Sequence, residues 1–382
     1  MQEDFHYYAT YCAAYLAGYS HDESLDICYS AQFVDLCSKT LLLKLKAPLI
    51  AATTQLQLEM MDSRTDILAL QDITRIWASF HFLPRDLYAK KKWATKRYLN
   101  KYRLICGPNG ELVKETVELA KGKSLQAIGI AMHVLADTWA HMYFAGTPSL
   151  CINNITGDFY ENYEDGDRKI KFKHNPTSPD DVEKGAYTNS LFQSNENSIM
   201  NLGHGRAGHF PDYSFARYRY VPAWGDYSLI YKDNPSDYLK AFSQMVYALK
   251  YLNGRFFSFD IERYDYEAIE PYRERIVKIL KKRQLNACAD WKAFGEELSG
   301  ESIPDFDIER YQYEYIKADR RYKNKTFLAR FLAAAIAQKA MVTNEIFKSG
   351  NILAGFTKEI KYQEKEDDDD KIREWLNSKI RQ

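Results

Sequence analysis

The run from Ala127 to His141 most constrains how this chain can fold. It reads Ala-Ile-Gly-Ile-Ala-Met-His-Val-Leu-Ala-Asp-Thr-Trp-Ala-His, so His133, Asp137 and His141 follow one another at intervals of four residues. Four residues make about one turn of an α-helix, which puts the three polar side chains on one stripe of an otherwise apolar helix. Because a buried imidazole or carboxylate without a partner costs several kcal/mol, the run predicts a core helix whose neighbours supply partners for these groups.

Ser124 precedes this run and belongs to a residue type that caps helix N-termini. The apolar residues that follow it recur at helical spacing, at Leu125, Ile128, Met132, Leu135 and Trp139. Two interpretations of the polar stripe remain open at this point. Two imidazoles and a carboxylate can bind a transition metal, or they can form a hydrogen-bonded His–Asp–His network inside the core.

The charge balance narrows the range of partners. The 382 residues include 52 Lys and Arg against 52 Asp and Glu, so no overall field favours duplex nucleic acid or an anionic membrane. A phosphorylated substrate remains compatible with this balance, because bound metal ions can supply positive charge locally.

The N-terminal sequence Met-Gln-Glu-Asp-Phe-His has no basic region followed by an apolar stretch, which predicts that there is no signal peptide. No apolar run reaches the length of a membrane span. The six cysteines are scattered without a Cys-x-x-Cys pair, as is typical of reduced core residues. We therefore expect a soluble, cytoplasmic protein without a membrane span; its oligomeric state is not predicted.

Helical spacing of apolar residues dominates the chain, and alternation with period two is scarce. This pattern predicts an all-α fold, a multi-helix bundle with a long irregular insertion at about residues 146–236, where Pro, Gly, Asn and Asp accumulate. The clearest strand candidate is residues 169–173. The predicted helices span residues 7–16, 23–40, 66–80, 112–120, 124–144, 238–252, 264–280, 291–298 and 324–347.

Three parts of the chain are expected. Residues 1–236 form a metal-binding helical core with an active-site loop, and residues 237–360 form a helical part packed on that core. The third part, residues 361–382, combines a charged hinge around Glu-Asp-Asp-Asp-Asp with a short terminal helix at 372–380.

Further candidate ligands lie in apolar or glycine-rich surroundings. They are His6 in Asp-Phe-His-Tyr-Tyr, Asp35 on an apolar helical face, His81 in Phe-His-Phe-Leu-Pro, and His204 and His209 in Gly-His-Gly-Arg-Ala-Gly-His-Phe-Pro-Asp212. Taken singly, each residue is more often structural than a ligand. Together they favour a metal site, because an apolar core rarely carries so many His and Asp without a shared task.

The order of these residues resembles the all-helical zinc-dependent phospholipase C and single-strand nuclease superfamily. Those enzymes carry on one helix a His, a metal-bridging Asp four residues later and a further His, which His133, Asp137 and His141 match. Upstream they have a His, an Asp and a second His, and downstream a His followed by an acid. The matching residues here are His6, Asp35 and His81, and then His204 or His209 with Asp212.

This resemblance covers about residues 1–215 and implies two or three divalent metal ions, zinc first, with manganese or iron as alternatives. The secreted enzymes also use the freed amino group of their first mature residue as a ligand. This chain begins Met-Gln, and a large side chain after Met normally blocks Met removal, so Asp4 is expected in that position. The chain more closely resembles an uncharacterised bacterial family that shares the Asp-Phe-His-Tyr-Tyr start and the Gly-His-Gly motif.

These observations lead to the hypothesis of a metal-dependent phosphoester hydrolase. Its expected substrate is a phosphorylated small molecule, a nucleotide or single-stranded nucleic acid. In this hypothesis Asp137 bridges metals, Asp35 is a ligand or general base, and Arg206 pairs with a phosphoryl oxygen. Aromatic residues between Tyr213 and Trp224 either stack on a base or pack over a loop.

Two alternatives stay open. One is a His-Asp type phosphohydrolase that uses His21 and Asp22, although Ser20-His-Asp-Glu also reads as a helix start with acids in its first turn. The other is a non-catalytic helical protein whose His and Asp form a structural network or hold a structural metal. His174, in Lys-His-Asn-Pro, is expected on a surface loop.

Overall fold

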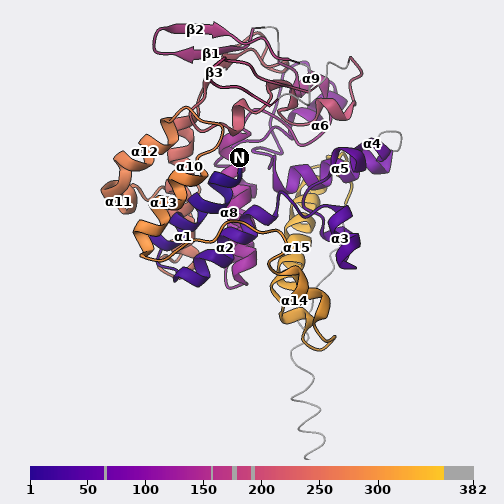
Figure 1. The fold of residues 1–382 in the computed structure, drawn as a ribbon. Coiled ribbons are helices and arrows are strands. Elements are labelled where there is room, and N and C mark those ends of the chain that lie inside the picture. The colour runs from indigo at the N-terminus through magenta and orange to yellow at the C-terminus, as the bar shows by residue number, and fades with distance from the viewer. Residues whose placement is uncertain (64–66, 156–157, 174–178, 191–193, 357–382) are drawn as a thin grey trace, which may run out of the picture.

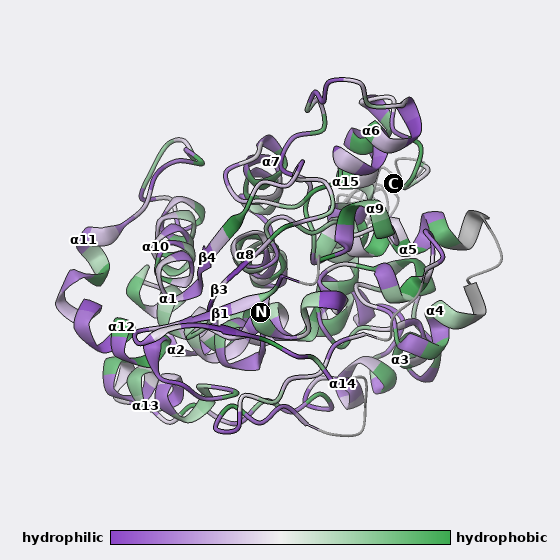
Figure 2. Ribbon diagram, turned by 90° about the horizontal axis from the view of Figure 1, so that it is seen from above, coloured by the Kyte–Doolittle hydropathy of each residue, from purple (hydrophilic) through white to green (hydrophobic). Residues whose placement is uncertain are grey.

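The computed structural model of this chain describes residues 1–63, 67–155, 158–173, 179–190 and 194–356. At its centre lies α8, Leu125–Ala140, which is buried on almost every side (Figures 1 and 2). Ser124 caps this helix by accepting a hydrogen bond from the Ala127 amide. The N-terminus of the chain lies beside α8 in the middle of the molecule in both views, so the first residues belong to the core.

The N-terminal segment packs against one side of α8. It begins with a π-helix, η1 (Asp4–Ala9), which continues as α1 (Thr10–Leu16). Next comes α2, His21–Phe33, which starts with a capping box between Ser20 and Glu23. The predicted helix over residues 23–40 is too long: α2 ends at Phe33, the chain turns, and Ser38 caps a new helix, α3 (Lys39–Leu45).

Helices from later in the chain complete the bundle. α7 (Glu111–Ala120), α10 (Asn234–Leu252) and α15 (Phe327–Lys348) pack directly on α8, and α5 (Ile67–Phe80) packs against both α15 and α8. α13 (Cys288–Ser299) covers η1. The C-terminal helices are therefore in direct contact with the segment that carries the N-terminal candidate ligands.

Shorter elements connect these helices. The predicted helix over residues 264–280 is interrupted at Pro271, which stands in a short 3-10 turn between two helices. The remaining short elements are η2 (Leu49–Ala51), α4 (Gln57–Ser63), α6 (Lys96–Tyr102), α9 (Leu150–Asn153), η3 (Ile199–Asn201), η4 (Gly205–Ala207), η5 (Phe210–Asp212), α11 (Tyr266–Ile269), η6 (Glu270–Tyr272), α12 (Arg273–Lys281), α14 (Gln312–Lys317) and η7 (Lys323–Lys325).

The fold is mostly helical, and the prediction of an all-α protein is wrong in one region. The insertion holds a four-stranded antiparallel sheet in the order β2-β1-β3-β4. In the view of Figure 1 this sheet lies above the helices, on the side of the chain's N-terminus. Its strands are β1 (Tyr160–Tyr163), β2 (Gly166–Lys169), β3 (Arg217–Tyr220) and β4 (Ile230–Asp233). The strand expected at residues 169–173 lies earlier in the chain: β2 ends at Lys169 and pairs with β1.

The sheet has its own aromatic core. Tyr218 and Tyr220 alternate on β3 with arginines, and their buried rings stack near Phe159 and Phe210. This packing fixes the insertion as a folded layer over the end of α8. Aromatic residues between Tyr213 and Trp224 therefore pack against other rings of the insertion, which agrees with the interpretation that they pack over a loop.

Gly129 lets α2 and α8 approach closely. A Cβ at this position would stand 2.3 Å from the Ile27 carbonyl oxygen and 2.5 Å from the Ser30 Cβ, both in α2. We expect Gly129→Ala to push the two helices apart and to lower the free energy of unfolding by about 1–3 kcal/mol. Chemical denaturation measures this loss. An unchanged free energy of unfolding in Gly129→Ala would contradict the close approach.

All six cysteines are free thiols in the structure. Within the described residues, no helix is both long enough and apolar enough to cross a membrane. The charged hinge and terminal helix expected at residues 361–382 lie outside the described part, as does His174.

Candidate metal centre

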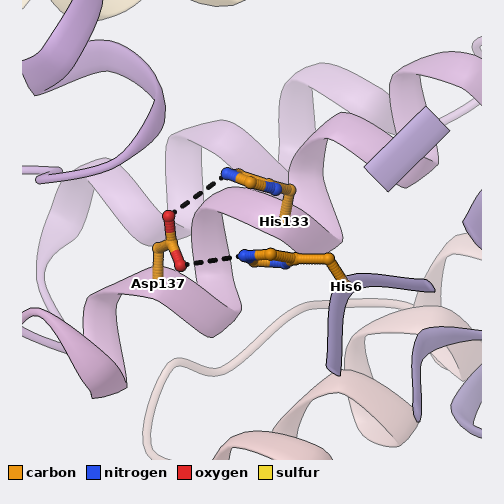
Figure 3. Close-up of side chains that lie close together, drawn as sticks. All are labelled: His6, His133 and Asp137. Carbon is orange, nitrogen blue, oxygen red and sulfur yellow. Dashed lines mark ion pairs between the residues drawn. The ribbon is translucent and has the colours of Figure 1, made fainter. Parts of the chain in front are cut away.

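Asp137 lies at the centre of the converging side chains. Its two carboxylate oxygens face different imidazoles, as Figure 3 shows: Oδ1 lies 3.1 Å from His6 Nε2, and Oδ2 lies 3.2 Å from His133 Nε2. The rings of His6 and His133 stack with their centroids 3.8 Å apart. A helix (α8) and a π-helix (η1) thus bring residues that are far apart in sequence to one carboxylate, with the geometry of a bridging ligand.

A second group adjoins the first on the Oδ2 side of Asp137. His81 Nδ1 lies 3.3 Å from Asp137 Oδ2 and 3.7 Å from Asp35 Oδ1, and His133 Nε2 lies 3.9 Å from the same Asp35 oxygen. Asp35 stands in the turn after α2, and its side chain is 29% exposed. It is therefore the carboxylate of this group that reaches solvent.

The third group consists of His141, His204 and Asp212. His141 Nε2 lies 3.0 Å from Asp212 Oδ1, and His204 Nε2 lies 3.5 Å from Asp212 Oδ2. His209 also approaches Asp212 at 3.5 Å, but its side chain is 57% exposed. Only His204 of the two histidines in this loop joins a group that could hold a metal among the described residues.

Four of these imidazoles are oriented by main-chain carbonyl groups. Because a carbonyl oxygen only accepts, the ring nitrogen that faces it must carry the proton. His133 donates from Nδ1 to Ala31 O (2.9 Å), and His81 donates from Nε2 to Thr53 O (3.1 Å). His141 and His204 donate from Nδ1 to the carbonyls of His81 (2.7 Å) and Gly208 (2.8 Å). The other nitrogen of each ring points into the group, the usual arrangement of a metal-binding histidine.

Two of these inward-facing nitrogens lie close together. His133 Nε2 and His81 Nδ1 lie 3.2 Å apart, and the other nitrogen of each ring is already the donor to a carbonyl. Two neutral imidazoles cannot hydrogen-bond through these atoms. A tetrahedral zinc ion separates its ligands by roughly 3.3–3.6 Å, which is close to the distances found here.

His6 fits the same reading. Neither of its ring nitrogens has a hydrogen-bond partner, although the ring is fully buried and Nε2 faces Asp137 Oδ1. Burial first, and then the neighbouring His133, lower the pKa of His6 to about 4. A neutral buried imidazole with no partner costs free energy unless an ion takes its lone pair.

The two buried carboxylates of the centre are stabilised in their charged form. Burial alone would raise the pKa of Asp137 and of Asp212, but surrounding positive charge outweighs burial and holds both pKa values well below the usual range. For Asp137 the stabilising groups are His141, the Met1 amino group, His133 and His6. Burial also lowers the pKa of His204 to about 4, despite Asp212 nearby. The centre thus combines three carboxylates with the Met1 ammonium and several imidazoles, a donor set that can bind cations.

The Met1 amino group stands inside this centre. Its nitrogen lies 2.7 Å from Asp137 Oδ1, 3.1 Å from His141 Nε2 and 3.3 Å from Asp212 Oδ1. Burial alone would lower the pKa of this amino group, but the three nearby aspartates outweigh burial and raise the pKa to about 11. The structure does not bring Asp4 here: the Asp4 carboxylate accepts a hydrogen bond from the Ala287 amide (2.9 Å). The expectation that Asp4 takes the place of a terminal amine therefore disagrees with the geometry.

Comparison with known protein families identifies one match. Residues 1–346 match DUF6765, which is described as a family of unknown function. The chain belongs to this family. No curated protein and no solved structure matches the chain significantly. The match spans every residue of the three groups.

Other residues predicted for this DUF6765 chain lie elsewhere. The guanidinium of Arg206 donates from Nε (3.0 Å) and Nη2 (2.9 Å) to Asn201 Oδ1, which holds the glycine-rich loop. His21 stands in the first turn of α2, where Nδ1 pairs with the Tyr11 hydroxyl at 2.7 Å. His21 and Asp22 thus act at a helix start, and they join none of the groups that could hold a metal within the described ranges.

The choice between His204 and His209 leads to a direct prediction. We expect His204→Ala to weaken metal binding at least about tenfold, because it removes a lone pair from the third group. His209→Ala is the matched control, since His209 contacts the same Asp212 but faces solvent. Titration with zinc in competition with a chelator measures both affinities. A larger loss in His209→Ala than in His204→Ala would contradict this assignment.

Proposed function

We propose that this DUF6765 protein is a metal-dependent hydrolase that cleaves a phosphoester or phosphodiester bond. The observation that carries the proposal is the convergence of imidazole nitrogens on Asp137, with the other nitrogen of each ring fixed by a carbonyl. A divalent cation can bind such nitrogens together with the carboxylate.

Two or three divalent ions would fit the three groups. The first group of residues consists of His6, His133 and Asp137. The second consists of Asp35, His81 and His133, and the third of His141, His204 and Asp212. Imidazole with carboxylate suits zinc best, with manganese or iron as alternatives. Such ions, when bound, supply an acidified water and positive charge for phosphoryl oxygens.

The protein's own residues supply orientation and proton transfer. Asp137, fully buried and facing both His6 and His133, holds neighbouring ligands at fixed distances. Asp35, the partly exposed carboxylate, is placed to take a proton from a water that enters from solvent. The carbonyls of Ala31 and Thr53 keep the rings from turning, which preserves the site between turnovers.

The substrate class rests on two supports. The order of ligands along the chain resembles enzymes that cleave phosphodiester bonds, and hard phosphoryl oxygens suit clustered divalent ions. We propose a phosphorylated small molecule, a nucleotide or single-stranded nucleic acid as the substrate.

Hydrolysis of p-nitrophenyl phosphate and bis-p-nitrophenyl phosphate in the presence of zinc, manganese or iron tests this proposal. We expect one of the two esters to be cleaved, and Asp35→Asn to lower kcat by about 100-fold or more at a metal concentration that saturates the variant. Asp22→Asn is the matched control and tests the His21–Asp22 alternative. Metal binding without cleavage of any ester would favour the non-catalytic alternative, and a loss confined to Asp22→Asn would favour the His-Asp phosphohydrolase.

A further inference from the structure

A separate cavity of ≈ 570 Å³ lies near the C-terminal end of α8, and none of the residues of the metal centre lines it. Trp139 faces this cavity and is two residues from Asp137, which places it about 200° around the helix from the metal-facing stripe. Cys106 and Met142 also line this cavity. Asp35, the partly exposed carboxylate of the metal centre, does not line it.

Four aromatic rings surround this cavity: Tyr102, Trp139, Tyr143 and Trp224. The Trp224 ring lies 6.1 Å from that of Tyr102 and 6.0 Å from that of Tyr143. Both indole N–H groups are already engaged, since Trp139 donates to Gln244 Oε1 (2.8 Å) and Trp224 to the Tyr143 carbonyl (3.0 Å). These bonds fix the rings, and a planar ring is the ligand that such walls accept best.

Arg85 is the cation on this lining, and it can bind an anionic group on that ligand. Of the two lining carboxylates, Asp237 pairs with Lys232 at 2.6 Å, and Asp86 keeps its charge while it accepts a hydrogen bond from the Tyr88 amide at 2.8 Å. Arg85 has no ion pair among the residues that the structure describes. Its guanidinium is therefore available to bind a carboxylate or phosphate through two N–H groups.

One backbone position beside this cavity is strained. Tyr143 has φ of 82°, which a bulky side chain rarely adopts, whereas Asn109, with φ of 59°, is of a residue type that adopts this region readily. Two hydrogen bonds hold Tyr143 there. The Tyr143 amide donates to Cys106 O (2.9 Å), and the Trp224 indole donates to the Tyr143 carbonyl. Non-glycine residues held in such conformations concentrate at ligand sites, which supports the cavity as a binding site independently of its aromatic walls.

We infer that this cavity binds a small planar aromatic molecule that carries an anionic group, at a site separate from the metal centre. Its volume of ≈ 570 Å³ falls within the range of roughly 300–1,000 Å³ typical of small-molecule sites. The ring stacks among Trp139, Tyr143 and Trp224, and the anion pairs with Arg85. Carboxylate and phosphate share this chemistry.

Calorimetric titration of the full chain with indole-3-acetate and with phenyl phosphate tests this inference. The ligand that binds more tightly shows whether the site prefers a carboxylate or a phosphate. Tryptamine carries the same ring as indole-3-acetate with the opposite charge. Titrations use the Asp137→Ala variant as well as the wild type, so that binding at the metal centre is separated from binding in the cavity. We expect one saturable site per chain for an aromatic anion, unchanged in Asp137→Ala.

Two variants locate the site. We expect Arg85→Gln and Trp224→Leu each to weaken the aromatic anion about tenfold or more, because they remove a charged hydrogen bond and a stacking ring. Arg97→Gln, an exposed arginine on α6 outside the cavity, should leave the affinity unchanged. No saturable binding of either anion, tighter binding of tryptamine, loss of binding in Asp137→Ala, or equal weakening by Arg97→Gln would overturn the inference.

Discussion

Asp137→Asn is expected to lower metal affinity by more than about 100-fold and to remove hydrolysis of the phosphate esters. An amide keeps the shape of the side chain but loses the negative charge and one of two acceptor oxygens, both of which face imidazoles here. Loss of a residue that merely orients a ligand already costs 10–100-fold, so loss of the bridging carboxylate costs more. Zinc titration against a chelator gives the affinity, and the ester assay gives the rate.

A matched variant separates this effect from a general loss of charge. Asp290 lies on α13, where it pairs with Lys282 at 2.7 Å, away from the three groups. Asp290→Asn is expected to bind metal and to act like the wild type. Retained metal affinity in Asp137→Asn, in a variant whose circular dichroism shows a native fold, would contradict the bridging role.

Removal of the metals is expected to destabilise the fold. Ions that bind only the folded chain stabilise it by about 4 kcal/mol when their free concentration is a thousand times the Kd. Without them, Asp35, Asp137 and Asp212 repel one another in a buried space where the Met1 amino group supplies one positive charge. Thermal unfolding with and without a chelator measures this loss, and added zinc should restore the midpoint.

The Asp137→Asn variant is the control for chelation. Because this variant should hold little metal, a chelator should change its unfolding midpoint much less than it changes the wild-type midpoint. An equal shift in the two proteins would show that the chelator acts elsewhere, and no shift in the wild type would mean that metals do not stabilise this fold.

The central helix was predictable from sequence because its polar stripe and its apolar face repeat with one period. Residues 124–144 were expected as a helix, and α8 spans Leu125–Ala140. Helix ends are less predictable: α2 stops at Phe33, and the turn that follows brings Asp35 toward His81 and His133. A tertiary requirement of this kind leaves no periodic signal in the sequence.

The sheet was missed although one signal was present. Arg217-Tyr-Arg-Tyr220 alternates with period two, and its tyrosines are buried while its arginines are half-exposed. The strands are four residues long and lie far apart in sequence, so each is too short to be recognised alone. Their pairing depends on aromatic contacts that only the folded insertion creates.

The side chains of the candidate centre could be predicted by type and order, but their orientation could not. Main-chain carbonyls of Ala31, Thr53 and Gly208 fix three of the imidazoles, and any residue type supplies a carbonyl. The Met1 amino group likewise carries no side-chain signal. For the same reason the sequence left His204 and His209 equivalent, whereas burial separates them.

Elemental analysis of the purified protein beside the Asp137→Ala variant tests the central claim most directly. The account predicts two or three equivalents of a transition metal in the wild type and almost none in the variant, with both proteins folded. Absence of bound metal from the wild type, even after reconstitution with zinc, manganese and iron, would contradict the metal centre and with it the proposed hydrolase.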